Sequence, residues 1–255
     1  MRVDAASVKR ASLAALQRML QPDDLRVVFQ PIVDMSSGRR FAVEALIRCR
    51  LPGLQSPPEL FERAVASGCV GRLGRLVREI AFPLAAGVPL FVNVHPGELS
   101  DGWLVRPDDP MYFHDRDVFV EVTESVPLTH TDLCMSVVRE ICSRGAIFPV
   151  VDDLGAGYSN LRRIADFEPK VVKLDRGLVV GIDQHRRQRN LVRSLVQLCA
   201  DLGAWVVAEG IEARNELLAL IDCGVQYGQG YYLARPAFPT NPIHWPLDAT
   251  TPRLR

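Results

Sequence analysis

The chain has 255 residues, 48% of them hydrophobic and 24% charged, a composition that favours one compact domain over two small domains or a disordered segment. Its formal net charge is zero and its pI is about 7, so it lacks the broad positive field that holds duplex nucleic acid by its phosphates. The six cysteines show no C-x-x-C spacing and mostly lie in apolar segments, which predicts reduced, buried thiols.

The first predicted element is a short leading helix, assigned to residues 1–24. Apolar residues recur at roughly helical spacing over 7–20, and the pattern ends before Pro22. Lys9 and Arg10 interrupt the apolar residues before the core of a signal peptide or a membrane span could form. We therefore expect a cytoplasmic protein that does not enter a membrane.

After this helix one unit recurs, a β-branched run that ends in a polar residue, then a loop, then a stretch with helical periodicity. The eight runs are 26–33, 40–47, 90–94, 118–122, 147–151, 170–174, 205–208 and 225–231. The clearest helix between them is 187–202, which ends before Gly203. Its predicted apolar face consists of Leu191, Leu195, Leu198, Cys199 and Leu202.

Eight strands alternating with helices favour an α/β fold of the modified TIM-type (β/α)8 barrel, although an open doubly wound sheet also alternates in this way. Residues 34–38 join the first two runs and are too few for a parallel crossover, which predicts one antiparallel strand near the N-terminus. We assign residues 25–238 to the barrel domain. Repeated prolines make 239–255 a C-terminal tail.

Polar side chains close, or nearly close, most of the predicted strands. They are Glu44, Asn93, Glu121, Asp152, Asp153, Lys173 and Glu209. Each one alone is more often a helix cap, a turn residue or a surface charge. In a parallel barrel, however, the carboxyl ends of all strands meet at one face, so these residues should form a single acidic cluster.

Such a cluster predicts bound cations, because uncompensated buried carboxylates are costly and one lysine cannot offset them all. Oxygen ligands without Cys or His suit Mg²⁺ or Mn²⁺ better than zinc. The adjacent Asp152 and Asp153 could serve two ions. A two-metal site with a lysine is well matched to phosphodiester hydrolysis.

Eight short motifs then occur in a fixed order. They are FQPIVD at 29–34, EALIR at 44–48, VNV at 92–94, EVTES at 121–125, DDLGAGYSN at 152–160, VKLD at 172–175, AEGIE at 208–212 and QGYYLARP at 229–236. In these motifs the chain resembles the EAL family of cyclic di-GMP phosphodiesterases over about 29–236. The resemblance implies hydrolysis of cyclic di-GMP to linear pGpG with two Mg²⁺ or Mn²⁺ ions, and it allows a homodimer.

The resemblance also implies roles for particular residues. The implied metal ligands are Glu44, Asn93, Glu121, Asp152 and Asp153. The implied catalytic residues are Glu209 as general base, Lys173 beside the attacking water or its metal, and Asp153 at the second ion. The implied substrate-binding residues are Gln30, Arg48, Asp175, Glu212 and Gln229.

A mobile loop at 154–160 is implied to couple metal binding to dimer packing, with Glu124, Gly155 and Gly157 as its control residues. The chain departs from the family pattern at Leu154 and Ala156, and at His95 and Cys49 near the other motifs. A histidine beside a proline more often caps or packs a turn than binds a metal. These departures leave open a catalytically weak cyclic di-GMP receptor or a protein-interaction module as alternatives to the enzyme.

Overall fold

The computed structural model describes residues 22–100, 102–122, 131–155 and 160–247. The predicted leading helix lies outside these residues, except for a 3-10 turn, η1, at Pro22–Asp24. The strands are β1 Leu25–Asp34, β2 Arg40–Cys49, β3 Leu90–Val94, β4 Val118–Val122, β5 Ile147–Leu154, β6 Val171–Leu174, β7 Trp205–Ala208 and β8 Tyr227–Gly228. The helices are α2 Pro57–Ala66, α3 Val70–Leu84, α4 Pro96–Ser100, α5 Thr131–Ser143, α6 Asn160–Phe167, α7 Arg176–Val179, α8 Arg186–Asp201 and α9 Arg214–Asp222, with a second 3-10 turn, η2, at Pro110–Phe113. None of the helices in the described part of the chain has the length and apolar character of a membrane span.

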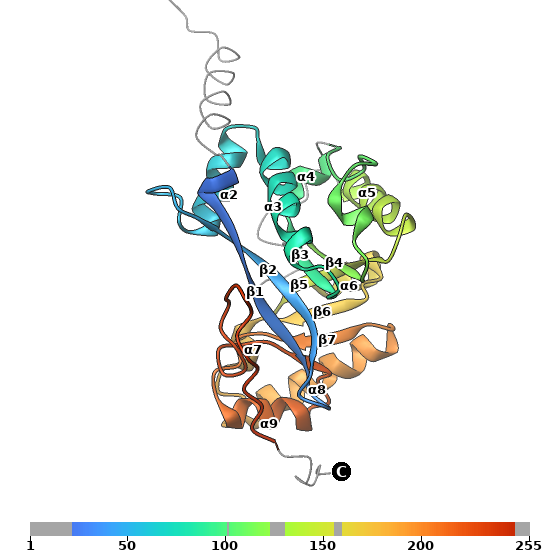
Figure 1. Cartoon of the computed structure of the whole chain (residues 1–255). Helices are drawn as coiled ribbons and strands as arrows, with labels where there is room; N and C mark the ends of the chain where they lie inside the picture. The colour runs from blue at the N-terminus through green and yellow to red at the C-terminus, as the bar shows by residue number, and fades with distance from the viewer. Residues whose placement is uncertain (1–21, 101, 123–130, 156–159, 248–255) are drawn as a thin grey trace, which may run out of the picture.

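The eight strands close into a barrel in the order of the sequence, which confirms the predicted fold class. β1 runs antiparallel to both β2 and β8, and every other neighbouring pair is parallel. The β1–β2 hairpin is visible as the long pair of blue strands in Figure 1. Its turn forms because Asp34 Oδ1 accepts the N–H groups of Ser36 and Ser37 at 2.6 and 3.0 Å, while Gly38 takes a φ of +71°.

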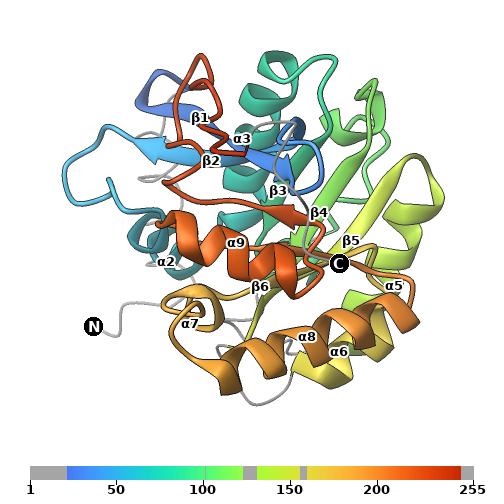
Figure 2. The ribbon, with the colours of Figure 1, turned by 90° about the horizontal axis from the view of Figure 1, so that it is seen from below.

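The helices lie around the strands, as Figure 2 shows, and the larger hydrophobic core fills the space between the two layers. Helix α8 begins and ends within one residue of its predicted bounds, but its buried residues are Val192, Val196 and Cys199. Leu191, Leu198 and Leu202 are 49%, 38% and 49% exposed, so the predicted apolar face was wrong for these three leucines, whereas Leu195 packs against the core. The leucine and valine faces are offset by one residue, about 100° around the helix, and the direction of the helix against the barrel decides which is buried.

The interior of the barrel is layered, because alternate residues of a strand face the same side of the sheet. The strands contribute a layer of apolar residues, Ile32, Ala42, Phe91, Phe119, Val150, Val171, Val207 and Tyr227. Two positions further along each parallel strand stand Glu44, Asn93, Glu121, Asp152, Lys173, Glu209 and Gln229. Glu44 lies in the middle of the long strand β2, and the others lie near or just beyond the ends of their strands. On the antiparallel β1 the order is reversed, and Gln30 precedes Ile32. A layer of polar residues therefore lies at the mouth of the barrel, directly above the layer of apolar residues.

A buried ion network joins α3 to the segments that follow β3. The guanidinium of Arg78 binds Glu98 at 2.7 Å and Asp109 at 3.0 Å, and all three side chains are at most 1% exposed. The two carboxylates also accept the N–H groups of His95 and Met111, at 3.0 and 3.1 Å. Because removing one partner of a buried pair costs about 3–5 kcal/mol, this network fixes the chain on the amino-terminal side of β4.

The segment after β8 packs back onto the barrel. Ala237 exchanges two backbone hydrogen bonds with Phe29 of β1, at 2.9 and 3.0 Å. Ile243 and Trp245 pack against the main core, and the Trp245 ring occupies the space that a Cβ of Gly38 would need. The predicted tail, 239–255, is therefore packed as far as these residues. Residues 248–255 lie outside the described chain, and the domain boundary at 238 stays a prediction.

Candidate active site

Lys173 of β6 lies at the centre of the polar layer and is 1% exposed. Its Nζ lies 2.7 Å from Glu121 Oε1, 3.4 Å from Glu44 Oε2 and 3.7 Å from Asp152 Oδ1, and it also contacts Glu209 Oε1. These carboxylates come from β2, β4, β5 and the residue after β7. The structure thus brings together the polar residues that the sequence placed at the ends of different strands.

Two amides donate to Glu44, and a third supports one of them. Asn93 Nδ2 donates to its Oε1 at 3.1 Å, and Gln229 Nε2 donates to its Oε2 at 2.6 Å. Gln229 Nε2 also contacts Gln30 Oε1 at 3.0 Å, and Gln30 Nε2 donates to the carbonyl of Ala234. Burial alone would raise the pKa of Glu44, but the nearby ammonium and these amides outweigh it and hold the pKa below its ordinary value.

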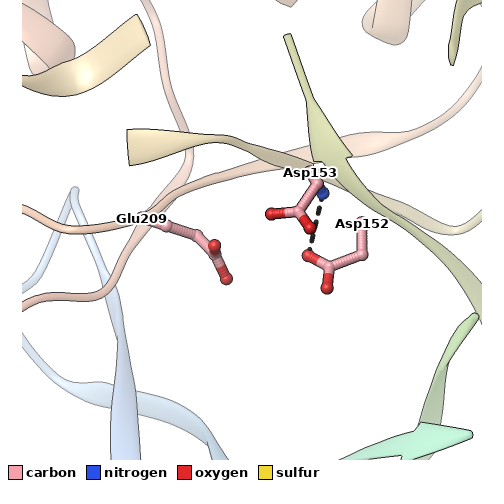
Figure 3. Close-up of side chains that lie close together, drawn as sticks. All are labelled: Asp152, Asp153 and Glu209. Atoms are coloured by element: carbon pink, nitrogen blue, oxygen red, sulfur yellow. Dashed lines mark hydrogen bonds between the residues drawn. The ribbon is translucent and has the colours of Figure 1, made fainter. Parts of the chain in front are cut away.

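Asp152, Asp153 and Glu209 face one another across the end of β5 (Figure 3). One carboxylate oxygen from each lies within 4.8 Å of the others. The backbone at Asp153 has a φ of +57°, which residues other than glycine rarely adopt, and its N–H donates to Asp152 Oδ1 at 3.0 Å. Local strain at functional sites is common, and here it accompanies two adjacent carboxylates at one opening.

Burial and crowding change the protonation of this cluster. Burial, reinforced by the neighbouring carboxylates, raises the pKa of Glu121 well above its ordinary value. Burial also raises the pKa of Glu209 to about 8, despite the attraction of Lys173. For Lys173 itself, burial alone would lower the pKa, but the four surrounding carboxylates raise it well above the ordinary value. In the absence of a further cation, protons therefore bind to part of the cluster.

The donors of the cluster fit divalent cations. Four carboxylates, Glu44, Glu121, Asp152 and Glu209, surround one ammonium group among the described residues, and a fifth, Asp153, lies beside Asp152 and Glu209. Both carboxylate oxygens of Glu121 are buried without a hydrogen bond of good geometry to any described group, although Lys173 Nζ balances part of the charge at 2.7 Å. Buried acceptors of this kind are rarely left unmatched in native proteins. Oxygen ligands with excess negative charge are what Mg²⁺ and Mn²⁺ prefer.

A pocket of about 480 Å³ opens beside the cluster. Its lining residues are Gln30, Glu44, Arg176, Glu209, Gly210, Glu212, Gln229, Gly230 and Tyr231. Of the five residues predicted to bind substrate, Gln30, Glu212 and Gln229 therefore share one pocket with the acidic cluster. Arg176 and Tyr231 also line the pocket and were not among the predicted site residues. Their positions next to Asp175 and Gly230 were the available signal in the sequence.

Two predicted substrate residues make other contacts. Arg48 Nη1 donates to the carbonyl of Ile47 at 2.8 Å, and Asp175 Oδ1 caps α7 by accepting the N–H of Gly177 at 2.8 Å. Neither residue lines the pocket described above. Their predicted contact with substrate stays a prediction.

The predicted loop-control residues are described only in part. Gly155 follows β5 with a φ of +113°, and a Cβ there would lie 2.6 Å from Leu178 Cδ1, so this position requires glycine. Glu124 and Gly157 lie outside the described residues. His95 caps a turn, as its position beside a proline indicated, since its Nδ1 accepts the N–H of Gly97 at 3.0 Å.

Metal-free protein should lose stability as the pH rises through about 8. The unfolded chain has an ordinary glutamate pKa of about 4.3, whereas folding raises the pKa of Glu209, so the folded state holds a proton that the unfolded state has released. This contribution is fully present below the unfolded pKa and is lost above the folded one. Urea unfolding in chelator across this range measures it. Glu209→Gln should flatten the dependence, and an equal slope in both proteins would contradict the assignment.

Comparisons with known proteins agree with the geometry. A family model described as EAL domain matches residues 13–236. The chain is 31% identical over 234 residues to the cyclic di-GMP phosphodiesterase PdeR of Escherichia coli, a match that covers 87% of this chain and 35% of that protein. The chain spans about a third of the length of several curated relatives that it matches.

Solved structures are similar as well. The complex of Klebsiella pneumoniae BlrP1 with calcium and cyclic di-GMP superposes with a TM-score of 0.71 at 32% identity, covering 85% of this chain and 57% of that one. A manganese and cyclic di-GMP complex of the same protein gives a TM-score of 0.73 at 32% identity, covering 86% and 57%. Both similarities extend over most of the barrel.

Proposed function

The chain belongs to the EAL domain family, and from that premise we propose that it hydrolyses cyclic di-GMP to linear pGpG with two divalent metal ions. The observation that carries the proposal is the convergence of five carboxylates and Lys173 beside a pocket of about 480 Å³. The metal-bound complexes of BlrP1 with cyclic di-GMP support the choice of substrate and of hard cations.

The donors proposed for the metals are Glu44, Asn93, Glu121, Asp152 and Asp153. When bound, Mg²⁺ or Mn²⁺ would supply positive charge to the scissile phosphate and acidity to the attacking water. Two observations support this assignment: both oxygens of Glu121 lack a hydrogen-bond partner among the described residues, and carboxylate oxygens of Asp152 and Asp153 lie within 4.8 Å of each other. Gln229 donates to Glu44 and is itself held by Gln30, so the two glutamines help to orient the Glu44 carboxylate.

The chain's own residues would then carry the proton transfer. Glu209 lines the pocket and contacts Lys173, so we assign it as the base that accepts a proton from the attacking water. Attack on phosphorus breaks the P–O3′ bond, and the departing oxygen takes up a proton to become the 3′-hydroxyl of pGpG. Lys173 would hold Glu209, Glu44 and Asp152 at fixed separations throughout, because it contacts all three.

The direct test is to incubate purified protein with cyclic di-GMP and Mg²⁺ or Mn²⁺ and to separate the products by chromatography. We expect pGpG in both metals and none in chelator. Calcium should inhibit, because it accepts a looser coordination geometry than Mg²⁺. Folded protein that binds cyclic di-GMP without forming pGpG would show the weak receptor instead, and protein that binds neither nucleotide nor metal would show an interaction module.

A homodimer and a cytoplasmic location are two further parts of the proposal. The homodimer that the resemblance allows is tested by sedimentation of the full chain, with and without cyclic di-GMP. The cytoplasmic location is tested by fractionating cells that express it. Both are independent of the chemistry above.

A further inference from the structure

The charge of the pocket lining is unbalanced for an anionic ligand. Among the residues that line it, Glu44, Glu209 and Glu212 are carboxylates, and Arg176 is the cation. Glu44 and Glu209 belong to the cluster around Lys173, whereas Glu212 stands apart from it at the rim and pairs with Arg176. A ligand phosphate that lies away from the metal ions therefore has one positive partner in this lining.

The aliphatic part (stem) of the Arg176 side chain is packed against the backbone, whereas its guanidinium is exposed. Arg176 begins α7, directly after the Asp175 cap, and its stem crosses Gly210. A Cβ on Gly210 would lie 2.6 Å from Arg176 Cγ, and Gly210 has a φ of +69°, so glycine is required there. The guanidinium donates to Glu212 Oε1 at 3.1 Å, but the two side chains are 59% and 48% exposed. Exposed pairs of this kind contribute little and open at low cost.

We propose that Arg176 binds the second, non-scissile phosphate of the cyclic dinucleotide, and that its pair with Glu212 opens when the substrate enters; this rests on the proposed function. A cyclic dinucleotide carries two phosphodiesters, and the metal cluster neutralises the one that is cleaved. The other would face the Glu212 carboxylate without compensation unless a cation moves to it. A guanidinium presents two parallel N–H donors that match two phosphate oxygens. Arg48, the arginine that the sequence suggested for phosphate, donates to a strand carbonyl and does not line this pocket.

The test is Arg176→Met, which keeps the stem over Gly210 and removes the charge. The KM for cyclic di-GMP should rise about tenfold or more, with kcat changed by less than about threefold. Arg176→Lys should recover part of the lost affinity, because lysine restores the positive charge but not the two parallel N–H donors of the guanidinium. Hydrolysis of bis(p-nitrophenyl) phosphate, which carries a single phosphodiester, should not respond. Arg193→Met, an exposed arginine of α8 that does not line the pocket, is the matched control.

A second arm separates direct contact from a role in orienting Glu212. In a Glu212→Gln background, a direct phosphate contact predicts that Arg176→Met still raises KM by a similar factor, whereas an orienting role predicts that its effect disappears. The same ratios can be read as Kd by calorimetry in Ca²⁺ if turnover is slow. An unchanged KM and Kd in Arg176→Met would overturn this inference while wild-type hydrolysis stands. Wild-type protein that neither binds nor cleaves cyclic di-GMP would overturn the proposed function as well.

Discussion

Lys173→Met should lower the free energy of unfolding of the metal-free protein by about 3–5 kcal/mol. Lys173 is 1% exposed, and its ammonium contacts carboxylates of four other strands or strand ends. Methionine retains most of the side-chain volume but leaves those carboxylates without their buried counter-charge. Urea unfolding in chelator measures the change. Saturating Mg²⁺ or Mn²⁺ should then stabilise the variant more than the wild type, because the ions replace the missing charge.

The chain provides a matched control in Lys170→Met. Lys170 lies three residues earlier, just before β6, and its ammonium stands over the Trp205 ring at 4.3 Å. Such a contact contributes about 0.5–1 kcal/mol at a partly exposed position. The control should therefore lose little stability and show no added response to metal. Equal losses in the two variants would mean that Lys173 does not hold the cluster together.

Glu209→Gln should lower kcat for cyclic di-GMP about 10²–10⁴-fold, the range expected for removing a general base. Glutamine is nearly isosteric and can still approach Lys173, but it cannot accept the proton of the attacking water. Because Glu209 is not among the residues proposed as metal donors, Mg²⁺ affinity should change much less than kcat. Single-turnover kinetics and calorimetric metal titration give the two quantities.

The informative comparison is Glu212→Gln, three residues further along and lining the same pocket. That side chain is 48% exposed and lies outside the cluster around Lys173, so its loss should change KM more than kcat. Similar kcat losses in both variants would show that pocket charge, not proton transfer, explains the effect. A Glu209→Gln enzyme with wild-type kcat would remove this residue from the proposed mechanism.

Much of the site could be predicted from local sequence because of strand periodicity. Glu44, Glu121 and Lys173 each stand two positions beyond an inward apolar residue, and parallel strands bring such positions to one end of a barrel. The short connection at 34–38 likewise predicted the antiparallel β1. The family motifs added Gln30 and Gln229, whose place in the polar layer follows the same alternation but whose residue type alone signals nothing.

Sequence by itself determined which residues lie on the strands, which of them alternate inward, and that their carboxylates must be balanced. Only the tertiary structure decided which groups are in contact. It buried the valine face of α8, and it gave Arg48 and Asp175 backbone hydrogen-bond partners. It also placed Arg176 against Glu212 at the pocket rim. The physical reason is the different range, along the chain, of the interactions involved. Periodicity and turn chemistry act within a few residues, whereas burial, charge pairing and the resulting pKa shifts depend on distances between segments far apart in the chain.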